Sequence, residues 1–115
     1  MPTMYEQDAN AAAELPKPEL FDFGEVIKGL KAGKAFARVG WNRQGQFIFR
    51  VPGSKFTVSR EPLLSQLGEG TPVNYRSHID IKTIDGSISV WNPSQRDMEA
   101  EDWFEVVGAL KGKAA

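Results

Sequence analysis

The chain has 115 residues, of which 41% are hydrophobic and 25% charged, a balance typical of one globular domain. Its formal net charge of -1 gives no overall attraction for DNA or an acidic membrane, so an anionic ligand needs local positive charge. The sequence contains no cysteine, which excludes disulfides, thiol nucleophiles and thiolate metal sites. It also lacks an apolar run of ~20 residues and a signal-peptide core, so we expect a soluble intracellular protein.

Three segments are expected. Residues 1–19 contain an alanine run and prolines but no hydrophobic period that could offset the entropy lost on ordering. They are predicted to form a mobile tail. Residues 20–108 are predicted to form a single ligand-binding domain, and residues 109–115 a C-terminal tail.

The domain is predicted to begin with a short helix. Asp22 and Glu25 have the spacing of a capping box, in which each side chain binds the main-chain N–H of the other residue. The helix should end near Ala32, because Gly33 suits the left-handed position that follows many helices. Its apolar residues recur at helical spacing: Phe23, Val26, Ile27 and Leu30.

After the helix the hydrophobic period changes to two, which predicts a strand over residues 35–39. Residues 40–45 have turn chemistry, and residues 46–51 are rich in aromatic and β-branched side chains, so the two strands should form a hairpin. A further short strand is predicted over 55–60, followed by a helical turn over 61–67.

A second hairpin is predicted from two alternating segments, 78–84 and 87–91, around Asp85-Gly86. This dipeptide favours a type I′ turn, in which both central residues have positive φ. Alternation along the first segment should place His78 and Asp80 on one face.

A polar helical turn should follow Pro93-Ser94, and residues 103–107 are predicted to form the closing strand. The fold class is therefore α+β: a small antiparallel sheet with an N-terminal helix and a short C-terminal helical turn.

The run Tyr75-Arg76-Ser77-His78-Ile79-Asp80 concentrates reactive groups around the only histidine of the chain. A carboxylate beside an imidazole can orient or charge it, so His78 and Asp80 could act together. The alternative is a polar surface pair. Catalysis by this pair is weakly supported, because no partner triad or metal-ligand spacing is present in the sequence.

Two other runs combine an aromatic ring with polar groups. Trp41-Asn42-Arg43 offers an indole, an amide and a cation, which suit a nucleobase, its edge and a phosphate. Alternatively, Trp41 only packs at the hairpin end. Trp91-Asn92-Pro93-Ser94-Gln95 repeats the theme, although Ser94 could instead be only a helix N-cap.

Two charged groups are better explained without a ligand. The acidic segment 97–102 lacks the spacing and central glycine of an EF-hand calcium loop. Lys28, Lys31 and Lys34 complement the C-terminal end of the predicted helix dipole, so we expect no binding of duplex DNA.

Several spaced motifs together resemble one family, the phage-encoded Thoeris anti-defence family two of signal-sequestering "sponge" proteins. The resemblance covers about residues 20–107. The motifs are Phe23-Gly24-Glu25, Gly33-Lys34, Ala37-Arg38, Gly40-Trp41-Asn42, Val51-Pro52-Gly53-Ser54, the Tyr75 to Asp80 run, Lys82-Thr83, Asp85-Gly86 and the segment from Trp91 to Trp103.

The resemblance implies a homotetramer whose pockets, built between protomers, trap glycocyclic ADP-ribose made by TIR-domain enzymes. It implies sequestration of the intact signal in the cytoplasm of the infected bacterial host, with neither turnover nor a cofactor. Some relatives also capture cyclic di- or trinucleotides. This chain departs from the expected pattern at Ser77, where we expect proline, and at Phe104, which is inserted after Trp103.

A cyclic ADP-ribose ligand requires stacking surfaces, amide or carboxylate partners for its base and riboses, and cations for its diphosphate. We expect ligand contacts from nine residues: Trp41, Asn42, Arg43, Arg76, His78, Asp80, Ser94, Gln95 and Asp97. Two rival functions remain open. One is a hydrolase of the nucleotide signal that uses His78 and Asp80, and the other is a phage structural or interaction module.

Overall fold

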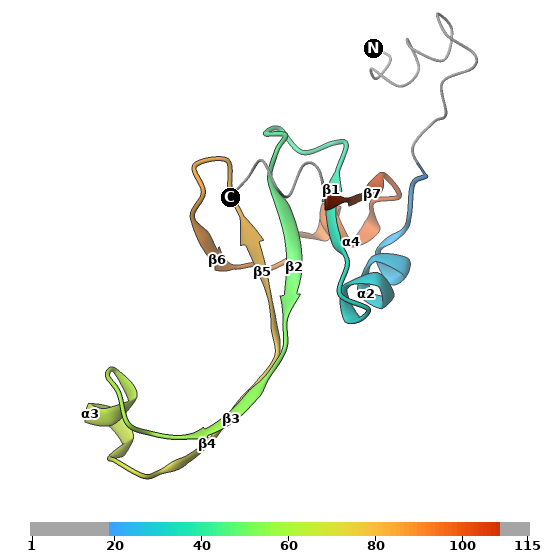
Figure 1. The fold of residues 1–115 in the computed structure, drawn as a ribbon. Helices are drawn as coiled ribbons and strands as arrows, with labels where there is room; N and C mark the ends of the chain where they lie inside the picture. The colour runs from blue at the N-terminus through green and yellow to red at the C-terminus, as the bar shows by residue number, and fades with distance from the viewer. Residues whose placement is uncertain (1–18, 109–115) are drawn as a thin grey trace, which may run out of the picture.

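The computed structural model describes residues 19–108. Apart from Glu19, the two expected tails, 1–19 and 109–115, lie outside the described residues. Figure 1 shows an antiparallel five-stranded sheet, in the order β6-β5-β2-β1-β7, with a helix beside it and a two-stranded arm. This arrangement confirms the α+β prediction. The helices are α2 (Phe23–Lys31), α3 (Leu63–Leu67) and α4 (Gln95–Glu99). The strands are β1 (Ala35–Arg38), β2 (Phe47–Val51), β3 (Ser54–Thr57), β4 (Pro72–Tyr75), β5 (His78–Lys82), β6 (Ile88–Val90) and β7 (Trp103–Val106).

The predicted capping box starts α2. The Asp22 carboxylate accepts a hydrogen bond from the Glu25 N–H at 2.8 Å, and the Asp22 N–H donates to the Glu25 carboxylate at 3.0 Å. Gly33 follows the helix with φ +91°, a left-handed conformation that glycine adopts without steric cost. Both predicted ends of the helix are therefore confirmed.

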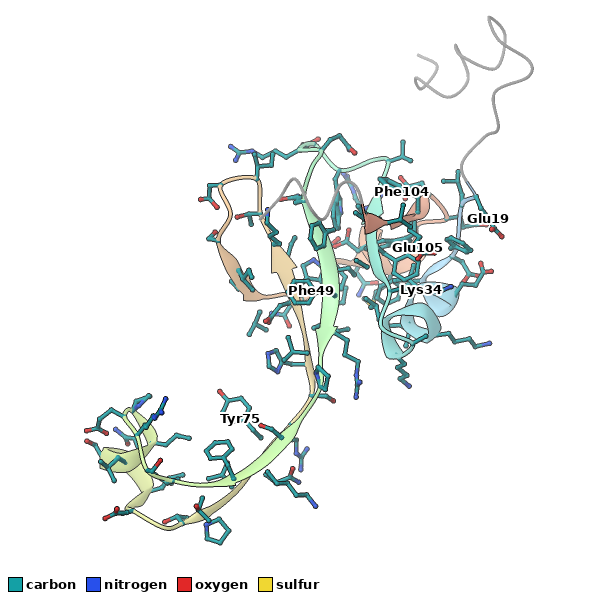
Figure 2. The ribbon with its side chains drawn as sticks, viewed as in Figure 1. Glu19, Lys34, Phe49, Tyr75, Phe104 and Glu105 are labelled. Atoms are coloured by element: carbon teal, nitrogen blue, oxygen red, sulfur yellow. The ribbon has the colours of Figure 1, made fainter. Side chains whose placement is uncertain are left out.

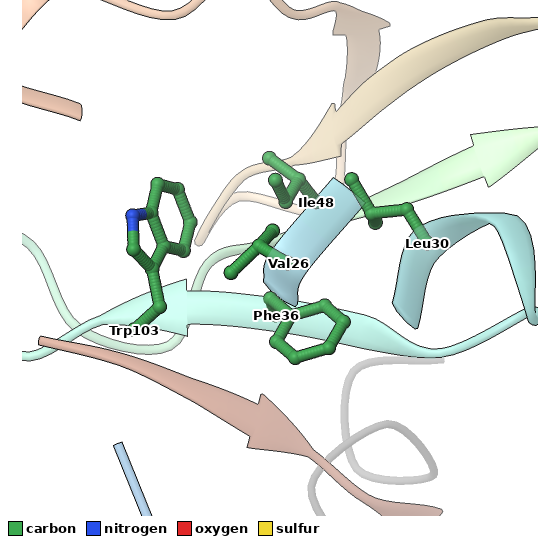
Figure 3. Close-up of a cluster of buried hydrophobic side chains, with 5 residues drawn as sticks. All are labelled: Val26, Leu30, Phe36, Ile48 and Trp103. Carbon is green, nitrogen blue, oxygen red and sulfur yellow. The ribbon is translucent and has the colours of Figure 1, made fainter. Parts of the chain in front are cut away.

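The core lies between α2 and one face of the sheet (Figure 3). Its buried side chains come from three strands and the helix: Val26, Leu30, Phe36, Ile48 and Trp103. Burying each of these side chains contributes about 1.5–3 kcal/mol relative to exposure. The core therefore fixes how α2 sits against β1, β2 and β7.

Strand alternation divides the remaining residues between the two faces. Arg50 of β2 pairs with Ile79 of β5, and Ile79 packs on the α2 core, so both belong to the α2 face. The neighbouring pairs Val51 with His78 and Phe49 with Asp80 belong to the opposite face. His78 and Asp80 thus share a face, as predicted.

The β3–β4 arm extends away from the sheet at the ends of β2 and β5 and has α3 at its tip (Figure 1). The predicted helical turn is confirmed, and the strand predicted over 55–60 is shorter and earlier, as β3. The strand that pairs with β3, β4, was not predicted from the sequence. Its residues include Pro72 and Asn74, which have low strand propensity, and the strand exists because Ser54 and the rest of β3 pair with it.

The turn between β5 and β6 corrects the predicted type I′ geometry. Among the described residues, only glycines have positive φ, so Asp85 cannot occupy a type I′ position. Instead the Gly86 N–H donates to the Thr83 carbonyl at 3.0 Å, and Gly86 adopts φ +90°. Asp85 accepts a hydrogen bond from the Ser87 N–H at 2.9 Å, which stabilises this longer, three-residue loop.

No helix within residues 19–108 is both long enough and apolar enough to cross a membrane.

Candidate functional site

An open cavity of about 350 Å³ lies beside α2, where β2, β5 and β6 come together. Its size is within the range of small-molecule sites. The apolar part of the lining comes from Ile27, Leu30, Ile79 and Val90. The polar and aromatic part comes from Lys31, Arg50, Ser77, His78, Trp91 and Asn92.

The two positively charged side chains of this cavity, Lys31 and Arg50, come from different elements. Lys31 is the last residue of α2, and Arg50 projects from β2 on the face that α2 covers. No carboxylate occurs among the lining residues. The cavity therefore presents local positive charge on a chain whose net charge is slightly negative, which suits an anionic ligand.

Trp91 and Asn92 form the wall that follows β6. The Trp91 N–H donates to the Ile79 carbonyl at 2.9 Å, which fixes the main chain against β5. The Trp91 ring also packs against Phe23 and Trp103, with centroids 6.2 and 6.0 Å away. Trp91 is half-buried, so part of a firmly held indole faces the cavity beside the exposed amide of Asn92.

A second hollow of about 390 Å³, between α2 and β7, has a different charge balance. Lys28 and Lys34 on its rim are matched by Glu25 and Glu105. Lys34 lies 3.8 Å from Glu105, and Figure 2 shows these two side chains close together. This hollow has no excess positive charge, so it is a poorer site for a diphosphate.

Three of the sequence-predicted residues, Trp41, Ser94 and Asp97, come together with Arg38 at the Asp97 carboxylate. Asp97 Oδ1 accepts hydrogen bonds from Arg38 Nη1 at 2.9 Å and from Trp41 Nε1 at 3.0 Å. Asp97 Oδ2 accepts from the Ser94 N–H at 2.9 Å. Arg38 also donates from Nε to Asp102 at 2.8 Å, so one guanidinium joins two carboxylates.

This network explains the ionisation of Asp97 and Arg38. Burial alone would raise the pKa of Asp97, but hydrogen bonds from Ser94, Trp41 and Arg38 outweigh it and lower the pKa. Burial likewise opposes the charge on Arg38, whereas Asp102 and Asp97 together raise its pKa. Both groups are therefore charged at neutral pH.

Ser94 and Trp41 both have the structural roles that were the alternatives to ligand binding. Ser94 is the N-cap of α4, because its hydroxyl accepts from the Asp97 N–H at 3.1 Å in a capping box. Trp41 packs edge-on against Trp103, with ring centroids 5.4 Å apart. Their polar atoms are thus occupied within the protein, although Trp41 is only half-buried.

His78 and Asp80 form a pair, with 3.4 Å between His78 Nε2 and Asp80 Oδ1. His78 Nδ1 lies 3.3 Å from the Arg76 carbonyl. His78 borders the cavity, but strand alternation directs its side chain and that of Asp80 toward the face opposite α2. Asp80 therefore belongs to the face opposite Arg50, whereas His78 still borders the cavity that Arg50 lines.

The other sequence-predicted residues are exposed and do not line the cavity: Asn42, Arg43, Arg76 and Gln95. Arg76 and Ser77 lie in a break between β4 and β5, so regular alternation does not extend back from His78 to Arg76. Ser77 and His78, although adjacent in the chain, both line the cavity.

The two cations of the cavity, Lys31 and Arg50, are not among the site residues predicted from the sequence. Lys31 was explained by the helix dipole, and Arg50 was counted only as part of a strand. The available signal was the position of Arg50 two residues after Ile48, which places it on the same face as an expected core residue. Among the described residues, no group of three His, Asp or Glu side chains is arranged to hold a metal ion.

The sequence of this chain matches a known protein family. Residues 21–106 match the family model described as Tad2-like, the Thoeris anti-defense 2-like domain. The chain belongs to this Tad2-like family. A curated Tad2-like relative, "Thoeris anti-defense 2" of Bacillus phage SP01, is 39% identical over 87 residues, covering 70% of this chain and 89% of that protein. The family suggested by the sequence motifs is thereby confirmed, and it is an anti-defence family.

Proposed function

We propose that this protein inhibits Thoeris defence by binding glycocyclic ADP-ribose and sequestering it without cleavage. The observation that supports this function is the cation-lined cavity of about 350 Å³. Membership of the Tad2-like family supports the anti-defence role. Under this proposal the protein acts in the cytoplasm of the infected bacterial host, where TIR enzymes make the signal.

The cavity has the chemical groups that such a ligand requires. Lys31 and Arg50 would bind the diphosphate, since charge-assisted hydrogen bonds to phosphate are strong and Arg can bind in a bidentate manner. The exposed part of Trp91 would stack on the adenine or a ribose. Asn92 and Ser77 would bind the ribose hydroxyls or the base edge.

A neighbouring protomer would complete this open site. We propose that six side chains predicted from the sequence reach the ligand across a protomer boundary: the exposed Asn42, Arg43, Arg76 and Gln95, and the half-buried His78–Asp80 pair. A shared pocket would enclose the ligand on more sides, and slow dissociation would then follow.

The β3–β4 arm would provide one contact of a homotetramer. Phe56 and Tyr75 stack on it with ring centroids 6.2 Å apart, and they are 39% and 51% exposed. Figure 2 shows Tyr75 projecting from the arm. Apolar groups that stay exposed on a projecting element are typical of protein–protein interfaces.

Sequestration fits the site better than hydrolysis. His78 borders the cavity that Lys31 and Arg50 line, but its Nε2 faces Asp80 and its Nδ1 faces the Arg76 carbonyl, so both ring nitrogens are already engaged within the protein. A general base needs to be within hydrogen-bond reach of the reacting group. Cyclic di- or trinucleotides, which carry the same phosphate and base chemistry, are further candidate ligands.

Native mass spectrometry with glycocyclic ADP-ribose tests the proposal. We expect a ligand-bound oligomer whose mass gives the number of bound molecules. A thermal-shift measurement should also show a higher melting temperature with ligand, since a ligand that binds only the native state stabilises it. If neither adduct nor shift appears with cyclic nucleotides, the protein is instead a structural or interaction module.

A further inference from the structure

Asp97 does not line the cavity, but it is linked indirectly to the Trp91–Asn92 wall by two separate routes. Along the chain, its Oδ2 accepts the Ser94 N–H at 2.9 Å, and Ser94 is joined to Asn92 by one residue, Pro93. Through space, the Asp97 carbonyl accepts a hydrogen bond from Trp103 Nε1 at 3.0 Å. Trp103 in turn packs against Trp91.

The first route is stiff. Proline fixes its own φ near −65°, so the position of Ser94 sets the direction in which Asn92 enters the wall. The capping box holds Ser94 from both sides, through its N–H and its hydroxyl. A shift of Asp97 would therefore move the polar group that Asn92 presents to the ligand.

Asp97 is itself held in place. It is 8% exposed, and Arg38 donates to its Oδ1 from β1, which lies within the sheet. Arg38 is anchored a second time by Asp102. Hydrogen bonds from charged donors to a partly buried carboxylate are stronger than neutral ones, so this anchor is rigid.

We propose that Asp97, held by Arg38, is a positioning residue that fixes the Trp91–Asn92 wall in the conformation that accepts the signal. This inference rests on the proposed function and assigns Asp97 a role without ligand contact. Both of its carboxylate oxygens are already occupied by Arg38, Trp41 and Ser94.

The test compares Asp97→Asn with Asp102→Asn. Each change removes one carboxylate from Arg38, but only Asp97 bonds to Ser94; Asp102 bonds to the Gly40 N–H instead, at 2.7 Å. An asparagine at position 97 has a single acceptor oxygen, so it cannot serve Arg38, Trp41 and Ser94 together from two oxygens. The pair therefore separates positioning of the wall from general loss of an ion pair.

Two measurements are made on each variant. Hydrogen exchange of the Ser94 and Asp97 amides should accelerate by about tenfold in Asp97→Asn, the factor expected for losing a hydrogen bond to a charged group, and should change little in Asp102→Asn. Affinity for glycocyclic ADP-ribose should fall by about tenfold in Asp97→Asn and stay within about threefold in Asp102→Asn.

A folded Asp97→Asn protein with native exchange or native affinity would overturn the proposal, as would an equal loss of affinity in Asp102→Asn. If Asp97→Asn does not fold, Arg38→Lys replaces it, because lysine keeps the charge but cannot span both carboxylates. The same accelerated exchange and weaker binding are expected of that variant, and their absence would overturn the proposal. If the wild-type protein binds no signal, the proposed function fails, and the exchange result alone decides whether Asp97 orders the wall.

Discussion

Gly29 of α2 lies directly against the ring of Phe36 in β1. A Cβ atom at position 29 would be only 2.3 Å from Phe36 Cζ. Glycine therefore allows the helix to approach the sheet closely enough to bury Val26 and Leu30, which are 0% and 1% exposed.

Gly29→Ala should lower the free energy of unfolding by about 1–3 kcal/mol, because the buried ring must leave its packed position. Gly24→Ala is the matched control on the same helix, since a Cβ there makes only an ordinary contact of 3.4 Å with Asp22. It should be neutral or slightly stabilising, because alanine favours helix. Urea unfolding measures both. Equal stability of the two variants would contradict the close approach of α2.

Lys31→Gln should weaken binding of glycocyclic ADP-ribose by about tenfold, because it removes a cation from the cavity. Lys28→Gln is the matched control one helical turn earlier, where the lysine lies by the charge-balanced hollow. It should retain affinity within about threefold. Titration calorimetry of both proteins checks the difference, and equal losses would indicate a general charge effect instead of a site.

Arg50→Gln should weaken binding at least as much as Lys31→Gln, because a planar guanidinium can hold a phosphate through two hydrogen bonds. The loss should be largest at low salt, where charge interactions are least screened. The measurement is affinity at two ionic strengths. Unchanged affinity in a folded Arg50→Gln protein would remove this cavity from the proposed site.

The β5–β6 turn predicts a specific acid dependence of stability. Hydrogen bonds from the Thr83 hydroxyl, then the Ser87 N–H and hydroxyl, lower the pKa of Asp85 from 3.8 to about 2. Because the folded state favours the ionised form, this contribution is present above pH 3.8 and is lost as the pH falls toward about 2.

Asp85→Asn should therefore be less stable than wild type at neutral pH, and the difference should shrink between pH 4 and pH 2. Thermal unfolding across this range measures it. A difference that stays constant with pH would show that the Asp85 charge has no role in the turn.

The arm is expected to control assembly. If the proposed tetramer forms through the arm, Phe56→Ser combined with Tyr75→Ser should shift the native mass toward smaller species, because these rings would be buried between protomers. Ile84→Ser is the control, since Ile84 is 52% exposed in the β5–β6 turn, away from the arm. A tetramer that persists in the double variant would exclude the arm rings from the interface.

Much of the fold could be predicted from local patterns in the sequence. Local signals identified α2 through Asp22 and Glu25, and alternation identified the pairing of His78 and Asp80. The arm was only partly predictable, because β4 forms through pairing with β3 and has little propensity of its own. The turn at Asp85-Gly86 was predicted at the right place with the wrong geometry, since side-chain hydrogen bonds favour the longer loop.

The site was harder to predict, because its residues meet only after folding. Lys31 and Arg50 are 19 positions apart in the numbering and converge where α2 packs on β2. Conversely, Trp41 and Asp97 are 56 positions apart in the sequence, and the Trp41 indole N–H donates a hydrogen bond to the Asp97 carboxylate. Both groups were expected from the sequence to contact the ligand. Such long-range contacts are set by packing and leave no local pattern.

The central claim is capture without cleavage, and recovery of the ligand tests it most directly. The protein is incubated with glycocyclic ADP-ribose, separated from free ligand, and denatured, and the released small molecules are analysed by mass spectrometry. We predict that intact glycocyclic ADP-ribose is released in proportion to the protein. Release of cleaved phosphoribosyl fragments, or of no nucleotide at all, would contradict this account.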